Sequence, residues 1–373
     1  MDEPYLRRRE RMLEAAAASG IEALVCYSSG IHSFIEMDPV WYATGHKPLG
    51  PSGLVVAHGV EPVLYLQPSW DVPRASETAA VEVRPSGDLF ASLGKALATT
   101  GIGTSATGVC GTEKLGVVDV ERLEAAVGAG WKTFDEGARQ VGVVKDEHER
   151  ELIRKATWIA EEGYRHALAE VRPGMREYEL AGQLDVFMRE LGADDNFLIV
   201  SASLHNLSVH VPGDRILAEG DILLAEISPS FRGAFAQICR TAVIGEVSTT
   251  LAEGYELLRE AYRRGLVAAR PGATMGQVVE AVNGPIEAAG FEEFCRPPYM
   301  RTRGHGMGIG SPFPISVSAD SPIELKEGMT FVLHPNQYLP PTGYLLCGDH
   351  VAVGADGAEP LSAQLAQLDV VGC

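Results

Sequence analysis

The feature that most constrains the fold of this chain is a faint internal repeat in its second half. Residues 167–197 are echoed by residues 266–294, and each copy reads as a helix, a stop at Arg-Pro-Gly, a second helix and an end at glycine. A polar segment with a histidine follows each copy, and then a turn and a strand pair, "AEGDILLAEIS" and "LKEGMTFVLHP". A duplication of this kind predicts two α-β-β halves around a pseudo-two-fold axis, where shared sites often lie.

The first half of the chain follows another pattern. Between residues 8 and 140 helical and extended segments alternate, which predicts an α/β layer domain. From about residue 145 to residue 170, charged and apolar residues fall at the spacing of a long amphipathic helix. We therefore place a domain boundary near residue 143, with a smaller α/β domain at 1–142 and a second domain at 143–373.

Composition narrows the class of protein and the kind of partner. Of the 373 residues 46% are hydrophobic and 22% are charged, which is typical of a globular chain. No apolar run reaches the length of a membrane helix, and the charged N-terminus does not resemble a signal peptide, so we expect a cytoplasmic protein. The net charge of −19 argues against nucleic acid and anionic membranes as partners. Six scattered cysteines favour a reducing compartment.

Five segments carry a family resemblance: "KDEHERELIRKA", "VRPGMREYEL", "HVPGDRILAEGD", "GHGMG" and "LKEGMTFVLHP". In this order and spacing, from about Lys145 to the end, they resemble the creatinase, prolidase and methionine aminopeptidase superfamily. The preceding residues look like a creatinase-type N-terminal domain. The resemblance implies an α+β protein with a pita-bread C-terminal domain. It also implies a homodimer, in which the N-terminal domain of one subunit closes the site of the other.

The resemblance also implies where metal ligands would lie. Peptidases of this superfamily hold two metal ions with two Asp, one His and two Glu side chains, and these positions fall on Glu226, Gln237, His305, His334 and Gly348. Two adjacent divalent ions need bridging carboxylates to offset their repulsion. The bridging positions are Gln237, a neutral amide, and Gly348, which has no side chain. From this charge argument we expect no cofactor.

The remaining groups predict acid–base or covalent catalysis. Strand alternation places Leu224 and Glu226 on one face of their strand, and Val332 and His334 on one face of theirs. The resemblance implies that Glu226, His210, His305 and His334 converge on one pocket. The metal-free relatives creatinase and ectoine hydrolase suggest the roles. Glu226 attacks carbon or activates water, His210 passes a proton to the leaving nitrogen, and His305 and His334 donate hydrogen bonds to the developing charge. We expect a metal-independent hydrolase of a C–N bond in a small amide, cyclic amide, amidine or guanidino compound.

Further residues are candidates for binding the small-molecule substrate. Gln237 faces the same pocket as Glu226, and Arg303 is able to clamp a substrate carboxylate. Trp41 and Tyr42 are candidates from the N-terminal domain, although buried aromatic residues more often belong to a core. Each of these residues, and each catalytic candidate, also has a structural interpretation: as a core side chain, as a solvated surface side chain, or as a side chain paired with a neighbouring residue.

Two other functions stay open at this point. One carboxylate and two imidazoles, Glu226, His305 and His334, match the ligand count of a site for one divalent metal ion. A mononuclear metal-dependent hydrolase, or a divergent Xaa-Pro aminopeptidase or dipeptidase, is therefore an alternative. A third possibility is a non-catalytic binding module that keeps a peptidase fold.

Overall fold

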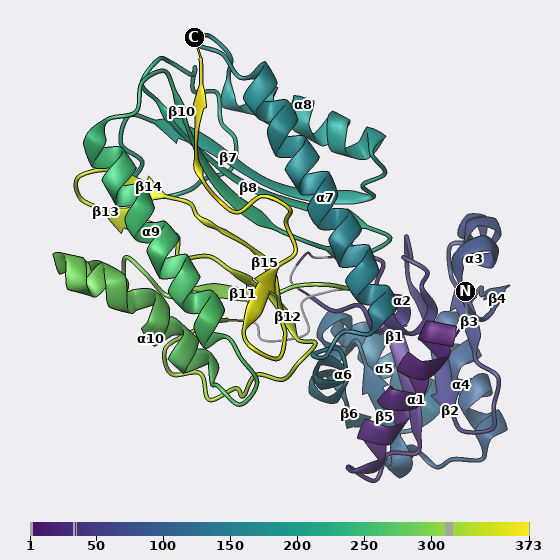
Figure 1. The fold of residues 1–373 in the computed structure, drawn as a ribbon. Coiled ribbons are helices and arrows are strands. Elements are labelled where there is room, and N and C mark those ends of the chain that lie inside the picture. Colours follow the sequence, from purple (N-terminus) through teal and green to yellow (C-terminus); the bar gives the residue numbers. More distant parts are fainter. Residues whose placement is uncertain (1–2, 33, 35, 310–315, 373) are drawn as a thin grey trace. The chain divides into compact units, whose positions relative to one another are not determined.

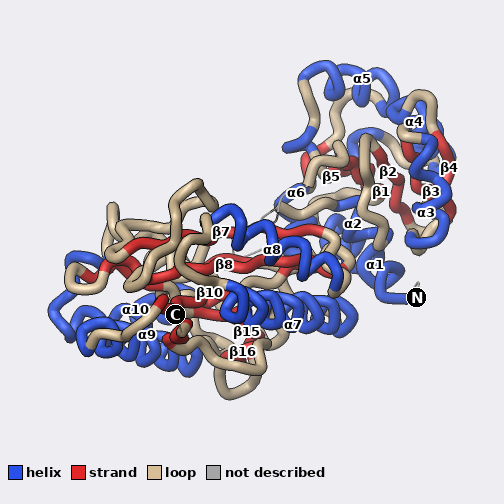
Figure 2. Tube along the Cα trace, turned by 90° about the horizontal axis from the view of Figure 1, so that it is seen from above, coloured by secondary structure: helices blue, strands red, loops and turns tan. Residues whose placement is uncertain are grey.

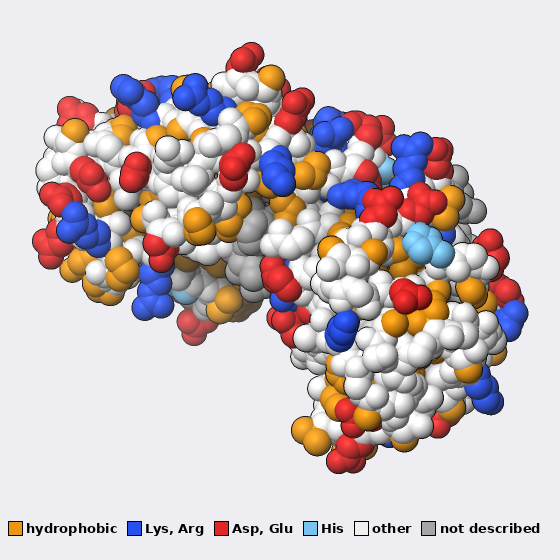
Figure 3. Space-filling view, turned by 90° about the horizontal axis from the view of Figure 1, so that it is seen from below, with side chains coloured by type: hydrophobic (Ala, Val, Ile, Leu, Met, Phe, Trp, Pro, Cys, Tyr) orange, Lys and Arg blue, Asp and Glu red, His pale blue; other side chains and the backbone are white. Residues whose placement is uncertain are grey.

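The computed structural model describes residues 3–32, 34, 36–309 and 316–372. Its contacts divide the chain into two compact units, Met1–Val143 and Val144–Cys373, and each unit has a sheet of its own (Figure 1). None of the described helices is both long enough and apolar enough to cross a bilayer. On the face drawn in Figure 3, basic side chains are interspersed with acidic ones.

The N-terminal unit is built on a six-stranded mixed sheet in the order β4-β3-β2-β1-β5-β6. Its core lies between the central strands and two helices, where Val25, Val55, Leu93 and Leu123 are buried together. The strands are β1 (Ala23–Ser28), β2 (Ser52–Ala57), β3 (Val63–Leu66), β4 (Glu82–Pro85), β5 (Thr107–Cys110) and β6 (Lys132–Thr133). The helices are α1 (Glu3–Ala17), α2 (Pro39–Thr44), α3 (Val72–Thr78), α4 (Leu89–Thr100), α5 (Val117–Val127) and α6 (Asp135–Val141).

The C-terminal unit contains the predicted α-β-β repeat. The first half consists of α7 (Glu147–Glu170), α8 (Glu177–Glu190), β7 (Asp195–Ser203), β8 (Ile222–Phe231), β9 (Ala234–Phe235) and β10 (Ile238–Ile244). The second half consists of α9 (Thr249–Ala268), α10 (Met275–Ile286), β11 (Gly304–Gly306), β12 (Thr330–Leu333), β13 (Gln337–Leu339), β14 (Gly343–Leu345), β15 (Gly348–Val353), β16 (Ala358–Pro360) and β17 (Leu368–Val371).

One nine-stranded sheet joins the two halves, with its main path in the order β11-β12-β15-β10-β8-β7. The strands along this path are antiparallel, and α7, α9 and α10 lie on one side of the curled sheet (Figures 1 and 2). Helix α7 packs on β8 and β10, and α9 packs on β12. The two halves meet where β10 pairs with β15, so side chains from both halves share the sheet face that the helices leave uncovered.

Candidate functional site

Glu226 lies in the middle of β8, a strand whose other residues are almost all apolar and buried. It is paired across the sheet with Cys239 of β10, whose thiol lies 3.9 Å from Glu226 Oε1. The same oxygen accepts a hydrogen bond of 3.0 Å from Asn336 Nδ2. Burial raises the pKa of Glu226 to about 7, although the hydrogen bonds from Asn336 and Cys239 act in the opposite direction. The carboxyl group is therefore partly ionised near neutral pH.

The amide of Asn336 is held in place by contacts on its other side. Its Oδ1 accepts a hydrogen bond of 2.9 Å from the backbone N–H of Cys347, which leaves Nδ2 to face Glu226. Its backbone oxygen accepts a bond of 3.1 Å from Arg303 Nη1. Asn336 is not among the residues predicted from sequence, although a polar residue two positions after His334 was a signal that this segment lines the site.

The register of the sheet brings the other candidates to the face of Glu226. Cys239 is opposite both Glu226 and Gly348, and Gln237 lies two residues from Cys239 on the same side. His305 is opposite Val332, and the rings of His305 and His334 have centroids 5.6 Å apart. Val332 is also opposite His350, a residue that was not predicted from sequence. We call this surface the Glu226 face; it carries Glu226, Gln237, His305, His334 and His350.

The imidazoles on this face are uncharged near neutral pH. Burial lowers the pKa of His305 below its ordinary value. Burial lowers the pKa of His334 to about 3, with smaller contributions from His305 and Arg303. Gln237 is buried as well, and its amide bonds Ser228 and Cys239. The Glu226 face therefore combines one titrating carboxyl group with neutral hydrogen-bonding groups, an arrangement suited to acid–base chemistry.

Among the described residues, no hydrogen bond or ion pair joins His210 to this group. Its side chain is half exposed, and its contacts among the described residues are the backbone oxygen of Val211 and the carboxylate of Glu177. Its expected role as a proton shuttle stays a prediction.

Trp41 and Tyr42 lie in α2 and are buried within the N-terminal unit. The guanidinium of Arg8 stacks over the ring of Tyr42, and His32 and Lys47 lie against the ring of Trp41. These contacts give both residues a structural role in the core of that unit. Their expected role in binding substrate stays a prediction.

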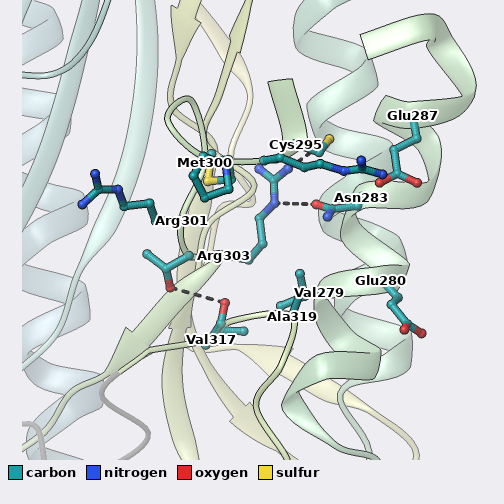
Figure 4. A pocket seen from close by; sticks show the side chains of 13 residues that line it. Val279, Glu280, Asn283, Glu287, Cys295, Met300, Arg301, Arg303, Val317 and Ala319 are labelled. Carbon is teal, nitrogen blue, oxygen red and sulfur yellow. Dashed lines mark hydrogen bonds between the residues drawn. The ribbon is translucent and has the colours of Figure 1, made fainter. Parts of the chain in front are cut away.

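Arg303, two residues before His305, is almost fully buried. Its guanidinium donates to Asn283 Oδ1 at 2.8 Å and to Gln337 Oε1 at 2.9 Å, both neutral acceptors. It also lines a cavity of about 330 Å³ beside α10, from which Arg301 points away (Figure 4). Neither Glu226 nor any of the histidines lines this cavity, so it is separate from the Glu226 face.

The donor set does not fit two metal ions. A side chain at Gly348 would collide with the backbone oxygen of Leu333, and its Cβ would lie 2.7 Å from His334 Cα. Gln237 is engaged with protein groups and carries no charge to bridge two cations. Within the described part of the chain, no three His, Cys, Asp or Glu side chains are grouped so that they could hold an ion.

Comparison with known proteins decides the family. Residues 151–358 match Metallopeptidase family M24. The chain belongs to this family. It is similar to the Xaa-Pro dipeptidase of Pyrococcus furiosus, with 26% identity over 329 residues that cover 87% of this chain and 90% of the relative.

Solved structures show the same fold. The prolidase from Pyrococcus horikoshii OT3 superposes with a TM-score of 0.83 at 23% identity, covering 97% of this chain and 99% of that chain. The dipeptidase PepE from Mycobacterium ulcerans gives 0.80 at 25% identity, covering 100% and 99%. The predicted superfamily, the pita-bread fold and the class of hydrolase acting on C–N bonds are thus confirmed for this M24 chain.

The expectation of no cofactor is wrong, because the chain belongs to a family of metallopeptidases and its relatives include Xaa-Pro dipeptidases. Metal independence, the main functional prediction from sequence, has no support in these comparisons, which favour the alternative of an Xaa-Pro peptidase. The missing bridging carboxylates limit how many ions the five positions are able to hold. They do not show that a member of this family works without metal.

Proposed function

We propose that this M24 chain hydrolyses small dipeptides with proline in the second position, with Glu226 as its acid–base group. The names of its relatives support the substrate, since they include Xaa-Pro dipeptidases that align over most of both chains. The observation that carries the catalytic role is a buried carboxyl group with a pKa of about 7, on one face with neutral histidines.

The chemistry follows from the protonation states. A carboxyl group that titrates near neutral pH takes a proton from water in its ionised form and returns it to the leaving nitrogen in its acidic form. His305 and His334, each neutral, supply N–H donors to the oxygen that gains charge as the amide carbon is attacked. Asn336 holds Oε1 of Glu226 and leaves Oε2 for the water.

The metal requirement is open to direct measurement. Because Gln237 and Gly348 replace the bridging groups, we expect one divalent ion per chain in place of two. Elemental analysis of the purified protein measures this ratio, and activity after chelation and after return of Zn²⁺, Mn²⁺ or Co²⁺ tests the requirement. Two tightly bound ions per chain would contradict our interpretation of the five positions.

A panel of substrates tests the function. We expect turnover of at least one Xaa-Pro dipeptide, and a loss of about 10²- to 10⁴-fold in kcat for Glu226→Gln, with the fold retained. Glu246→Gln, at an exposed position, is the matched control and should leave kcat unchanged. Unchanged turnover in Glu226→Gln would refute the role of this carboxyl group.

One observation favours a second substrate class. The replacement of two ligand positions by Gln237 and Gly348 removes anionic groups from the site, so the panel should include small cyclic amides, amidines and guanidino compounds. Turnover of one of these without turnover of any dipeptide would move the assignment to a non-peptide C–N hydrolase.

A further inference from the structure

The guanidinium of Arg303 is a buried charge without a carboxylate partner. Arg303 is 1% exposed, and an arginine side chain stays protonated in proteins. Its hydrogen bonds go to neutral acceptors, which are Asn283 Oδ1, the backbone oxygen of Asn336, Gln337 Oε1 and the thiol sulfur of Cys295. None of the Asp or Glu side chains in the described part of the chain forms an ion pair with it. A buried charge without a counter-charge destabilises a fold, so its presence needs an explanation.

The same guanidinium is able to bind a further acceptor. A guanidinium carries five N–H donors, and the bonds above use one on Nε, one on Nη1 and two on Nη2. The second N–H of Nη1 therefore has no acceptor among residues 3–32, 34, 36–309 and 316–372. The bond of 3.5 Å to Cys295 is weak, because a thiol sulfur is a poor acceptor. An anion thus finds one free donor and one that is easily replaced.

The cavity beside α10 gives a small molecule access to this donor. Its volume of about 330 Å³ lies in the range of pockets that bind small ligands. The guanidinium of Arg303 lies among the side chains that line it (Figure 4). Val279, Met300 and Val317 line it as well and are buried. The interior of the cavity therefore combines one buried cation with apolar surface.

The exposed residues that line the cavity, which we call its rim, carry unpaired carboxylates. Glu280 and Glu287 belong to the rim. Of the two rim arginines, Arg296 is paired with Glu292, and Arg301 points away from the cavity (Figure 4). The rim thus favours a positively charged group on the ligand, although solvent screens this interaction more than the one inside.

We propose that this cavity binds a small zwitterion such as a free amino acid. Arg303 holds the carboxylate inside the cavity, and the ammonium group faces Glu287 at the rim. The site is separate from the Glu226 face, and the inference goes beyond the proposed function without resting on it.

Calorimetric titration of the full chain with L-leucine, leucinamide and 4-methylpentanoate tests both contacts. Leucinamide lacks the carboxylate, so we expect its Kd to be about 10-fold or more above that of leucine. 4-Methylpentanoate lacks the ammonium group, and we expect its Kd to be about 2- to 5-fold higher, because that contact is exposed. Equal affinity for leucine and leucinamide would overturn the proposal, and so would no binding of leucine at about 10 mM. Tighter binding of inorganic phosphate than of leucine would overturn it as well.

Glu287→Gln tests the orientation of the ligand. This exposed substitution should raise the Kd of leucine about 2- to 5-fold and leave the Kd of 4-methylpentanoate unchanged. An equal change for both ligands, or none for leucine, would contradict the contact between the ammonium group and Glu287.

Two variants and a control place the ligand in the cavity. Arg303→Met should abolish the binding of leucine, whereas Arg301→Met, the matched control, should leave its Kd unchanged, because that side chain points away. Arg303→Met also removes the donor that Asn283 and Gln337 accept from. Ala319→Trp therefore serves as a second variant, since this exposed residue lines the cavity and an indole there blocks it. Binding that survives in Ala319→Trp would overturn the proposal.

Glu226→Gln separates this site from the Glu226 face. It should leave the Kd of leucine unchanged, because Glu226 does not line the cavity. Loss of leucine binding in this variant would place the amino acid on the Glu226 face and would overturn the proposal. A wild type that hydrolyses no member of the substrate panel would refute the proposed function and leave the binding measurement intact, so the two fail separately.

Discussion

The acid–base character of Glu226 is set by two opposing effects at the scale of single residues. Burial in β8 raises its pKa, and the N–H of Asn336 stabilises the ionised form. Asn336 acts only because its own amide is fixed by Cys347 and its backbone by Arg303. It is thus a positioning residue, and its removal should move the titration of Glu226 rather than abolish it.

We expect Asn336→Ala to shift the acidic limb of the pH profile of kcat/KM to higher pH. The physical reason is that the ionised form of Glu226 loses a hydrogen bond, so the pKa of Glu226 rises above about 7. Asn196→Ala, an amide of β7 that contacts Asp185, is the control and should leave the limb in place. A uniform loss of activity with an unmoved limb would show that Asn336 has only a structural role.

The pairing of β12 with β15 decides which side chains the Glu226 face is able to carry. Gly348 packs against the backbone of Leu333 and against His334 so closely that a Cβ has no space. The strand thus excludes a carboxylate at the position where the family resemblance places the last glutamate. At the scale of the element, Gly348 and His334 therefore lie against each other at the edge of this pairing.

We expect Gly348→Ala to lower the free energy of unfolding by about 2 kcal/mol or more, because the β12–β15 ladder must shift to admit the methyl group. Gly182→Ala, in the exposed interior of α8 with no atom within 4 Å, should instead stabilise by about 0.5–1 kcal/mol. Urea denaturation of both variants measures the difference. A Gly348→Ala variant as stable as the wild type would show that the ladder adapts freely.

Both units of the molecule bury histidines that must stay neutral in the folded state. Burial lowers the pKa of His46 to about 4 in the N-terminal unit, and the pKa values of His334 and His350 to about 3 in the C-terminal unit. The folded state therefore binds fewer protons than the unfolded state below pH 6.5. Stability that is present above that pH is lost as the pH falls. Glu226, whose pKa is raised, acts in the opposite sense between about pH 7 and its ordinary value of 4.5.

We expect the wild type to be less stable at pH 5 than at pH 7, and His350→Leu to lose about 2 kcal/mol less than the wild type over this interval. Urea denaturation at the two pH values gives the comparison. An identical pH dependence in the two proteins would mean that His350 is not held in its neutral form by the fold.

The sequence by itself determined the α-β-β repeat, the long helix α7 and the shared face of Leu224 and Glu226, because hydrophobic periodicity and strand alternation are local properties of the chain. Motif spacing also located His305 and His334. The sequence did not determine that Asn336 would contact Glu226, 110 residues away, or that His350 would share a face with His305. The resemblance placed His210 in the pocket, and this stays a prediction; its polar partners among the described residues are Val211 and Glu177. These relations depend on the register in which β10, β12 and β15 pair, and only the packing of the whole sheet sets that register.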